Sequence, residues 1–380
     1  MKEEIISKDI TRKDLENVGK QFGYTGEIEK ITPIKTGHIN ETFLVQYNDG
    51  EETKKYIFQS INTIVFKQPQ VVMANISATT KHIRKKFEEQ GIFSERRVLH
   101  FSQASDGLYY YEDEKHRFWR SYIYVDFAQT YNESQDTKLL YNSGLAFGKF
   151  QRQLSDFPME TLQDTIPDFH NTEVRFKQLR EAIDNDAMGR ADSVQKEIEF
   201  FNQRKSLASR LVNLQKEGKL PLRVTHNDTK CNNVLIDNET GEGICVIDLD
   251  TVMPGLSVYD FGDAIRSCGT SAAEDEKDLE KVHFVKANFE AFTKGFIEAS
   301  EGCFTKEEID NMVYGAIIMT MECGSRFLAD YLNGDKYFRT TREGHNLDRT
   351  RTQMKLVTEM EQIIDELNGI VQKEAAKTAK

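Results

Sequence analysis

A change in hydrophobic periodicity near residue 137 is the feature of this 380-residue chain that most restricts its fold. Before it, short apolar runs such as 28–34, 43–47 and 54–61 alternate with polar turns, a pattern typical of antiparallel strands joined by hairpins. The sequence therefore predicts an α+β protein, with a small antiparallel-sheet lobe first and a larger, mostly helical lobe after it. Apolar residues recur at helical spacing in residues 71–90, 139–154, 193–216, 276–300, 306–331 and 347–371.

Charge and cysteine content argue against several classes of function. The chain has 62 acidic and 50 basic residues, whereas binding to a nucleic acid backbone needs a basic surface. No window reaches the roughly 18 apolar residues of a membrane span, and the first residues, MKEEIISKDITRKDL, do not resemble a signal peptide. The five cysteines form no C-x-x-C pair, which favours free thiols in a reducing compartment. We therefore expect a cytoplasmic protein without nucleic acid or membrane partners, and a monomer, because no heptad run predicts a coiled coil.

One strand-like interruption of the helical part, residues 223–250, carries the candidate chemistry. Its sequence is RVTHNDTKCNNVLIDNETGEGICVIDLD, in which NNVLID and GICVIDLD flank a turn by composition, NETGEG, and predict a β-hairpin. Pairing of these strands would bring Asn233 close to Asp248, with Asp228 in the adjacent loop. Short oxygen-bearing side chains suit a hard cation, and a further carboxylate can accept a proton from a hydroxyl. Together they are what phosphoryl transfer to an alcohol requires.

Each of these three residues has a simpler interpretation by itself, because Asp and Asn concentrate in turns for conformational reasons. The combination is much rarer. It consists of H-x-D-x-x-x-x-N from His226 to Asn233, then a hairpin, then an apolar strand that ends in Asp248. We therefore interpret the three residues as functional.

These motifs resemble those of the aminoglycoside phosphotransferase/choline kinase superfamily, small-molecule kinases with a two-lobed protein-kinase-like fold. His226, Asp228 and Asn233 match its H-x-D-x-x-x-x-N motif, and the run that ends in Asp248 matches its second, metal-binding motif. The resemblance implies ATP as co-substrate, Mg²⁺ held by Asn233 and Asp248, and Asp228 as the catalytic base. His226 would orient the loop, and Asp250 would add a metal or water contact. It also divides the chain into a sheet lobe that covers ATP (1–122), a hinge (123–130) and a helical lobe with the catalytic loop and the sugar site (131–380).

Two further segments look like nucleotide-binding motifs but lie in the wrong context. Asp260-Phe261-Gly262 spells the D-F-G of protein kinases, yet it follows a turn and leads into an apparent helix. A metal-binding aspartate should instead end a buried strand, so we assign Asp260 a structural role. The run from Gly144 to Lys149 has too few residues between its glycines for a phosphate-binding loop and lies within a helical pattern. We reject it as a nucleotide site.

The nucleotide side is less clearly marked. The loop KTGHINETF lies where a kinase fold covers the phosphates, and its backbone amides could cradle them. Gln59 stands where such kinases carry a phosphate-binding lysine. Lys67 is a substitute candidate, although a solvated surface lysine is the simpler interpretation. The candidate ATP-binding residues are Gly37, His38, Asn40, Gln59, Tyr124 and Asp126, the last two from the expected hinge.

Over about residues 35–355 the chain resembles one family more specifically, the bacterial N-acetylhexosamine 1-kinases, which phosphorylate the anomeric hydroxyl of GlcNAc and GalNAc. The most specific segments are RFLADYLNGDKYF and REGHNLDRTRTQ, because many kinases share the catalytic motif. The resemblance implies that the sugar hydroxyl approaches Asp228 and attacks the γ-phosphate. An ion pair within the helical lobe is an equally good interpretation of each candidate arginine, and a loop role is equally good for the histidine. The candidate sugar-binding residues are His38, Asp228, Arg266, Ser267 and Arg326.

Two other functions stay open on sequence alone. One is a kinase for another small alcohol, such as homoserine, choline, methylthioribose or an aminoglycoside. The other is a pseudokinase that binds a nucleotide without catalysis. The missing strand lysine at Gln59 supports the pseudokinase, whereas the retention of Asp228, Asn233 and Asp248 opposes it.

Overall fold

The computed structural model describes residues 5–7, 9–34, 39–131 and 135–378. The chain divides into two compact units, and two short segments group with unit 1 although residues of unit 2 flank them in sequence. No sequence pattern indicated this grouping. Unit 1 comprises Met1–Ala128, Glu160–Ile166 and Leu249–Val252, and unit 2 comprises Gln129–Met159, Pro167–Asp248 and Met253–Lys380.

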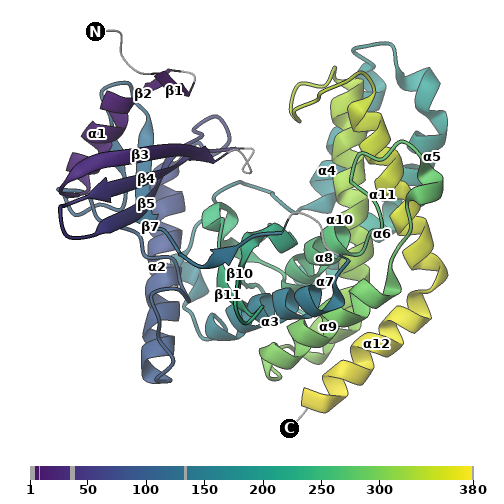
Figure 1. Ribbon diagram of the computed structural model, residues 1–380. Helices are drawn as coiled ribbons and strands as arrows, with labels where there is room; N and C mark the ends of the chain where they lie inside the picture. The colour runs from purple at the N-terminus through teal and green to yellow at the C-terminus, as the bar shows by residue number, and fades with distance from the viewer. Residues whose placement is uncertain (1–4, 8, 35–38, 132–134, 379–380) are drawn as a thin grey trace. The chain divides into compact units, whose positions relative to one another are not determined.

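Unit 1 is built on a five-stranded antiparallel sheet with strand order β3-β4-β5-β7-β6 (Figure 1). Alternate residues of β4 are buried, among them Phe43, Val45 and Tyr47, as the period of two in a strand requires. The register places Gln59 of β5 directly opposite Arg120 of β7. The strands are β3 (Glu27–Ile34), β4 (Glu41–Asn48), β5 (Thr53–Ile61), β6 (Tyr111–Glu112) and β7 (Phe118–Ile123).

Two helices accompany this sheet, α1 (Arg12–Gln21) and α2 (Pro69–Glu89), together with the short strands β1 (Ile5–Ser7) and β2 (Ile10–Thr11). The expected helix at 71–90 corresponds to α2, which has a proline in its first turn. Helix α1 was not expected. It begins with a capping box between Thr11 and Asp14, and it buries Leu15 in the cluster that contains the sheet residues of unit 1.

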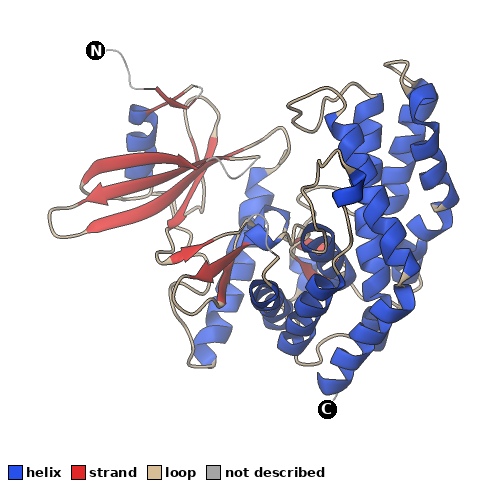
Figure 2. Cartoon of the chain, turned by 45° about the vertical axis from the view of Figure 1, so that its right-hand side comes forward, coloured by secondary structure: helices blue, strands red, loops and turns tan. Residues whose placement is uncertain are grey.

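Helices make up most of unit 2, and Figure 2 shows how few strands interrupt them. The predicted α+β class, with an antiparallel sheet in the N-terminal part and helices in the C-terminal part, is confirmed. No helix in the described ranges combines the length and the apolar character needed to span a membrane. Strand β8 (Ala128–Gln129) lies where the chain passes from unit 1 to unit 2. The helices of unit 2 are α3 (Thr137–Gln153), α4 (Thr172–Asn185), α5 (Gln195–Gln203), α6 (Lys205–Ala208), α7 (Arg210–Lys216), α8 (Ser257–Cys268), α9 (Lys286–Ser300), α10 (Lys306–Leu332), α11 (His345–Gln362) and α12 (Ile364–Thr378), and its strands are β9 (Arg223–Thr225), β10 (Val234–Asp237), β11 (Gly243–Val246) and β12 (Met253–Gly255).

Three predicted helical segments are shorter or more broken than the periodicity indicated. Residues 193–216 form three helices rather than one, with breaks at Arg204 and Ser209. The segment 276–300 becomes helical only from Lys286, because Asp278 caps a single 3₁₀ turn before it. The last segment contains two helices, which separate where Ile363 leaves the helical region with φ −119°.

The rejected motif from Gly144 to Lys149 is a helix-packing surface. Both of its glycines lie on α3 and face the backbone of α9. A Cβ atom on Gly144 would lie 2.4 Å from the carbonyl oxygen of Phe292, and one on Gly148 would lie 2.2 Å from that of Phe296. These glycines therefore permit a close approach of two helices.

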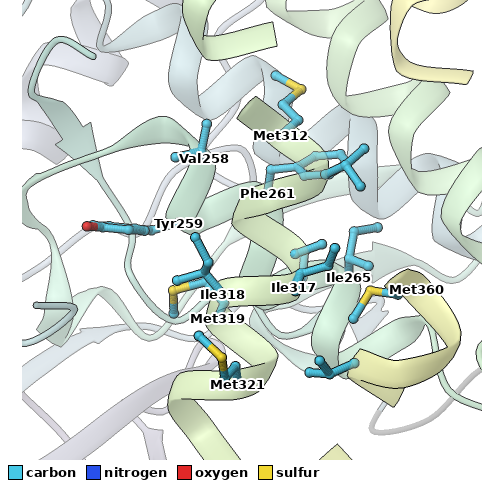
Figure 3. Packing of buried hydrophobic residues seen from close by; sticks show 14 of the residues in the cluster. Val258, Tyr259, Phe261, Ile265, Met312, Ile317, Ile318, Met319, Met321 and Met360 are labelled. Carbon is cyan, nitrogen blue, oxygen red and sulfur yellow. The ribbon is translucent and has the colours of Figure 1, made fainter. Parts of the chain in front are cut away.

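The D-F-G look-alike lies in the main core of unit 2. Figure 3 shows Phe261 among buried side chains of α8 and α10, such as Ile265 and Ile317. Phe261 is fully buried, and Gly262 packs against the carbonyl group of Gly315 on α10. This segment thus anchors α8, the helix that supports the loop described next.

Candidate active site

The predicted hairpin is present and consists of β10 and β11. The strands pair antiparallel with Val234 opposite Val246. Beyond the strand ends, the N–H of Ile247 donates to the carbonyl oxygen of Asn233 at 2.9 Å. Asn233 and Asp248 therefore both lie at the open end of the hairpin, because Asp248 directly follows Ile247.

Asp228 lies beside Asn233. The Nδ2 atom of Asn233 donates to the carbonyl oxygen of Asp228 at 2.7 Å and lies 3.3 Å from its Oδ2 atom. This arrangement turns the amide of Asn233 so that its Oδ1 atom is the one left to bind a cation. The side chain of Asp228 is 25% exposed, so it is accessible to a small molecule.

His226 connects the loop to the hairpin and is fully buried. Its Nδ1 atom accepts from the N–H of Asp228 at 3.2 Å, and its Nε2 atom lies 2.9 Å from the carbonyl oxygen of Ile247. These two partners require a proton on Nε2 and none on Nδ1. The edges of Phe147 and Phe150 pack near the ring, which fixes its orientation.

Asp260 supports the same loop from α8. Its carboxylate accepts from the N–H of His226 at 2.9 Å, from the N–H of Asn227 at 2.7 Å and from Nε2 of Gln151 at 2.6 Å. Burial raises the pKa of the Asp260 carboxyl, and these donors oppose that rise. The backbone of Asn227 has a φ of +63°, which is uncommon for a residue with a side chain, so it needs such support.

A second support reaches Asn227 from residues that sequence reasoning missed. Nε2 of His170 lies 2.9 Å from the carbonyl oxygen of Asn227, and Nδ1 lies 2.9 Å from Oε1 of Glu322 on α10. Thr172 donates to the other oxygen of Glu322 at 2.7 Å. Burial lowers the pKa of His170, but the hydrogen bond and charge of Glu322 outweigh it, so this pKa is raised. No local motif signals these residues, because their partners lie far away in the sequence.

Lys230 was also missed, although its position two residues after Asp228 was a possible signal. Its Nζ atom lies 2.8 Å from Oδ1 of Asp228. Burial raises the pKa of the Asp228 carboxyl, but the charge and hydrogen bond of Lys230 outweigh this effect. The pKa of Asp228 is therefore lowered, and its carboxylate is ionised at neutral pH.

The donor set at the end of the hairpin fits a hard divalent cation. Within the described residues no three His, Cys, Asp or Glu side chains cluster as a metal site. The oxygen-bearing side chains of this region are instead those of Asn233, Asp228 and Asp248, whose amide and carboxylate oxygens are ligand types that Mg²⁺ accepts. Asp248 has a left-handed backbone with a φ of +60°, a conformation that is costly for a residue with a Cβ and clusters at functional sites.

The predicted nucleotide-binding residues that the structure describes belong to unit 1. Asn40 donates to Oδ2 of Asp250 at 2.6 Å, and Gln59 accepts from Nε of Arg120 at 2.9 Å. Lys67 is exposed. In the expected hinge, Nζ of Lys55 lies 2.6 Å from Asp126 and 5.9 Å from the ring centre of Tyr124. Gly37 and His38 lie outside the described residues.

Three predicted sugar-binding residues of the helical part, Arg266, Ser267 and Arg326, contact other residues of the protein. Arg266 is buried and pairs with Asp263 at 2.8 Å and with Glu274 at 2.9 Å, which is the ion-pair interpretation. Ser267 donates to a backbone carbonyl oxygen within α8. The guanidinium of Arg326 lies 5.4 to 5.8 Å from the ring centres of three aromatic residues, Phe169, Tyr337 and Phe338.

Solved structures with a similar fold are small-molecule kinases and phosphotransferases. Choline kinase from Cryptosporidium parvum Iowa II matches with a TM-score of 0.53 and 15% identity, over 90% of this chain and 91% of that one. Plasmodium vivax ethanolamine kinase matches with a TM-score of 0.52 and 15% identity, over 85% and 82%. Spectinomycin phosphotransferase in complex with ADP and spectinomycin matches with a TM-score of 0.50 and 16% identity, over 98% and 99%.

At such low identity these likenesses establish the fold, which is the protein-kinase-like α+β fold. The family follows from the sequence, because residues 30–292 match the model of the phosphotransferase enzyme family. This range covers more than half of the chain and contains the whole hairpin and its supporting loop. The chain therefore belongs to the phosphotransferase enzyme family and has a kinase-like fold.

Proposed function

We propose that this protein transfers the γ-phosphoryl group of ATP to the anomeric C1 hydroxyl of an N-acetylhexosamine, GlcNAc or GalNAc. The observation that carries the phosphoryl-transfer part is the junction of Asp228, Asn233 and Asp248 at the open end of one hairpin. Membership of the phosphotransferase family supports the same conclusion. The sugar is supported by the resemblance of the C-terminal segments and by the polar groups near the loop.

Asp228 acts on the nucleophile in this proposal. It accepts a hydrogen bond from the attacking hydroxyl, orients it and takes its proton. The lowered pKa of Asp228 makes it a weak base, which suits an anomeric hydroxyl because that group is more acidic than an ordinary alcohol. Asn233 and Asp248 hold Mg²⁺, which supplies positive charge to the phosphates when bound.

His226, Asp260 and His170 act as positioning residues. His226 accepts from the backbone N–H of Asp228, and Asp260 and His170 hold the backbone of Asn227 just before it, so none of the three contacts a reacting atom. A preorganised loop lowers the entropic cost of bringing hydroxyl and phosphate together. Arg326 remains a candidate partner for the acetamido group, and Asn40 and the backbone at Tyr124 to Asp126 remain candidate contacts to the nucleotide.

Asp263 on α8 supports a neutral polyol as the acceptor. One of its oxygens accepts from Nε of Arg266 at 2.8 Å, whereas Oδ2 is buried and has no hydrogen-bond partner in the described part of the chain. An unsatisfied buried acceptor costs about 1–3 kcal/mol, and a substrate hydroxyl would supply the missing donor.

An ATP-consumption assay with Mg²⁺ over a panel of acceptors tests this proposal. The panel contains GlcNAc, GalNAc, glucose, galactose, homoserine, choline and kanamycin, with phosphorus NMR of the product. We expect turnover on the N-acetylhexosamines and an acid-labile anomeric phosphate. Turnover on another alcohol alone would reject the sugar and keep the phosphoryl-transfer site. ATP binding without turnover on any acceptor would reject the catalytic proposal.

A further inference from the structure

A buried ion pair joins Arg120 and Asp250 within unit 1. Arg120 lies on β7, and Asp250 lies in the short segment Leu249–Val252 that groups with unit 1. Their side chains are 2% and 4% exposed. The guanidinium contacts both carboxylate oxygens, with NH2 of Arg120 at 3.0 Å from Oδ2. Such a two-point pair fixes orientation as well as distance.

Neighbouring polar groups complete the hydrogen bonding of this pair. Gln59 on β5, directly opposite Arg120 in the sheet, accepts from Nε at 2.9 Å. Asn40 donates to Oδ2 of Asp250 at 2.6 Å, and its own Oδ1 atom accepts from the N–H of Asn62 at 3.0 Å. Burial of two charges is costly unless such partners satisfy them, so the site is built for this one arrangement.

The segment that contains Asp250 is also held through its backbone. Nδ2 of Asn75 on α2 donates to the carbonyl oxygen of Val252 at 2.9 Å and to that of Gln163 at 2.7 Å. The 3₁₀ turn Leu249–Thr251 packs against α2 as well. The chain is therefore anchored immediately after Asp248.

Asp248 lies between two fixed points of the chain. On one side the N–H of Ile247 is bonded to Asn233, and on the other side Asp250 is bound to Arg120. The left-handed backbone of Asp248 persists only if its surroundings impose it, since that conformation is unfavourable for a residue with a side chain. The two fixed points supply that constraint.

We propose that Arg120 and Asp250 are positioning residues that hold the backbone of Asp248 in the conformation in which its carboxylate would bind the metal. This inference rests on the proposed role of Asp248 as a metal ligand. The inference also assigns a role to Gln59, which stands where the resemblance predicts a lysine. Gln59 orients Arg120 on the neighbouring strand β7. Asp250 then acts through Arg120 and not as a ligand of its own, which replaces the metal or water contact that the sequence suggested.

The experiment measures equilibrium binding of Mn²⁺ in the presence of ADP, by electron paramagnetic resonance, so that no turnover is needed. The variants are Arg120→Met, Arg120→Lys and Asp250→Asn, with Asp248→Asn as the reference. The matched control is Arg204→Met, which breaks another two-point arginine–carboxylate pair, with Glu361 of α11 in unit 2, outside the segment 223–252. Thermal unfolding of every variant reports stability separately.

We expect Arg120→Met and Asp250→Asn to weaken Mn²⁺ binding by about 10- to 100-fold, the range for residues that orient a metal ligand. Arg204→Met should lower the melting temperature and change Mn²⁺ binding by less than about twofold, since Arg204 and Glu361 lie outside the segment that supports the metal site. Arg120→Lys keeps the charge, so it should recover part of the affinity. It also keeps the test valid if Arg120→Met does not fold.

Three outcomes would overturn the inference. If Asp248→Asn loses Mn²⁺ and Arg120→Met does not, the pair is only structural. If Asp250→Asn loses Mn²⁺ and both Arg120 variants retain it, Asp250 is itself a ligand. If Asp248→Asn binds Mn²⁺ like the unchanged protein, the proposed metal role of Asp248 fails and the inference fails with it.

Discussion

The end of β11 and the start of α8 each present an aspartate, and their surroundings are opposite. Asp260 on α8 is almost fully buried, and three N–H donors fill its carboxylate. Asp248 has a left-handed backbone and follows Ile247, whose N–H donates to the backbone carbonyl oxygen of Asn233. A carboxylate whose acceptor sites are filled by backbone N–H groups stabilises a loop, whereas a carboxylate on a left-handed backbone at a strand end is a candidate ligand for a cation. Although Asp260 begins the D-F-G letters, its hydrogen bonds indicate a structural role, and Asp248 is the proposed metal ligand.

The largest expected effect on activity comes from a substitution of Asp228, the proposed catalytic base that lies near both aspartates in the sequence. Asp228→Asn should reduce kcat by about 10³-fold or more, because the amide cannot accept the proton, while the fold is retained. Single-turnover kinetics with ATP and GlcNAc, together with circular dichroism, measure both quantities. Turnover like that of the unchanged enzyme would remove Asp228 from the mechanism.

Asp248→Asn tests the aspartate at the strand end, the proposed metal ligand. Loss of one charged ligand should reduce kcat/KM by at least about 100-fold at a fixed Mg²⁺ concentration, since the metal contributes several kcal/mol to the transition state. Higher Mg²⁺ should restore part of the activity, and the melting temperature should change little. An unchanged dependence of the rate on Mg²⁺ would contradict the assignment of Asp248.

Asp260→Asn tests the aspartate whose carboxylate accepts three N–H donors. It should lower stability more than Asp248→Asn does and activity less. The amide cannot accept all three N–H donors, so unfolding should become easier by about 3 kcal/mol, as when one partner of a buried charged network is removed. Activity should fall by about tenfold, because the backbone before Asp228 loosens, a cost of roughly 1.4 kcal/mol. Denaturant unfolding and a Mg²⁺ titration of the rate distinguish it from Asp248→Asn. A raised Mg²⁺ requirement in Asp260→Asn would break the comparison.

The hairpin that carries the three candidate residues could be predicted from the sequence, because it is local in the chain. Asp228, Asn233 and Asp248 share one short segment, and a turn between two apolar runs predicts their hairpin without knowledge of the rest of the fold. The α+β class followed in the same way from the change of periodicity.

The supports of the site could not be predicted, because they depend on tertiary packing. The carboxylate of Glu322 reaches His170 from a helix 152 residues away, and Arg120 meets Asp250 across 130 residues. Neither pair leaves a pattern in hydrophobic periodicity. The burial of Arg120 could not be predicted either, because a buried arginine in a strand is exceptional unless a carboxylate pairs with it. The roles of all candidate site residues, catalytic, metal-, nucleotide- and sugar-binding, remain predictions.

The smallest expected effect concerns Lys230, which lies beside Asp228 on the open side of the loop. Because Lys230 lowers the pKa of Asp228, Lys230→Met should raise that pKa and move the acid limb of the kcat/KM profile to higher pH. The lowered pKa also contributes stability that is present above the unfolded-state pKa and is lost as pH falls through the folded-state pKa. The stability difference between Lys230→Met and the unchanged protein should therefore shrink in acid.

At neutral pH the loss of activity in Lys230→Met should be at most about fivefold, because a half-exposed ion pair contributes up to about 1 kcal/mol. Lys219→Met is the matched control, since Lys219 pairs with Glu217 at 2.8 Å on the surface and lies outside the loop. That control should leave the acid limb where it is. If Lys230→Met leaves the acid limb of the kcat/KM profile unchanged, a group other than Lys230 sets the ionisation of Asp228. The ion pair between Lys230 and Asp228 would then have no part in catalysis.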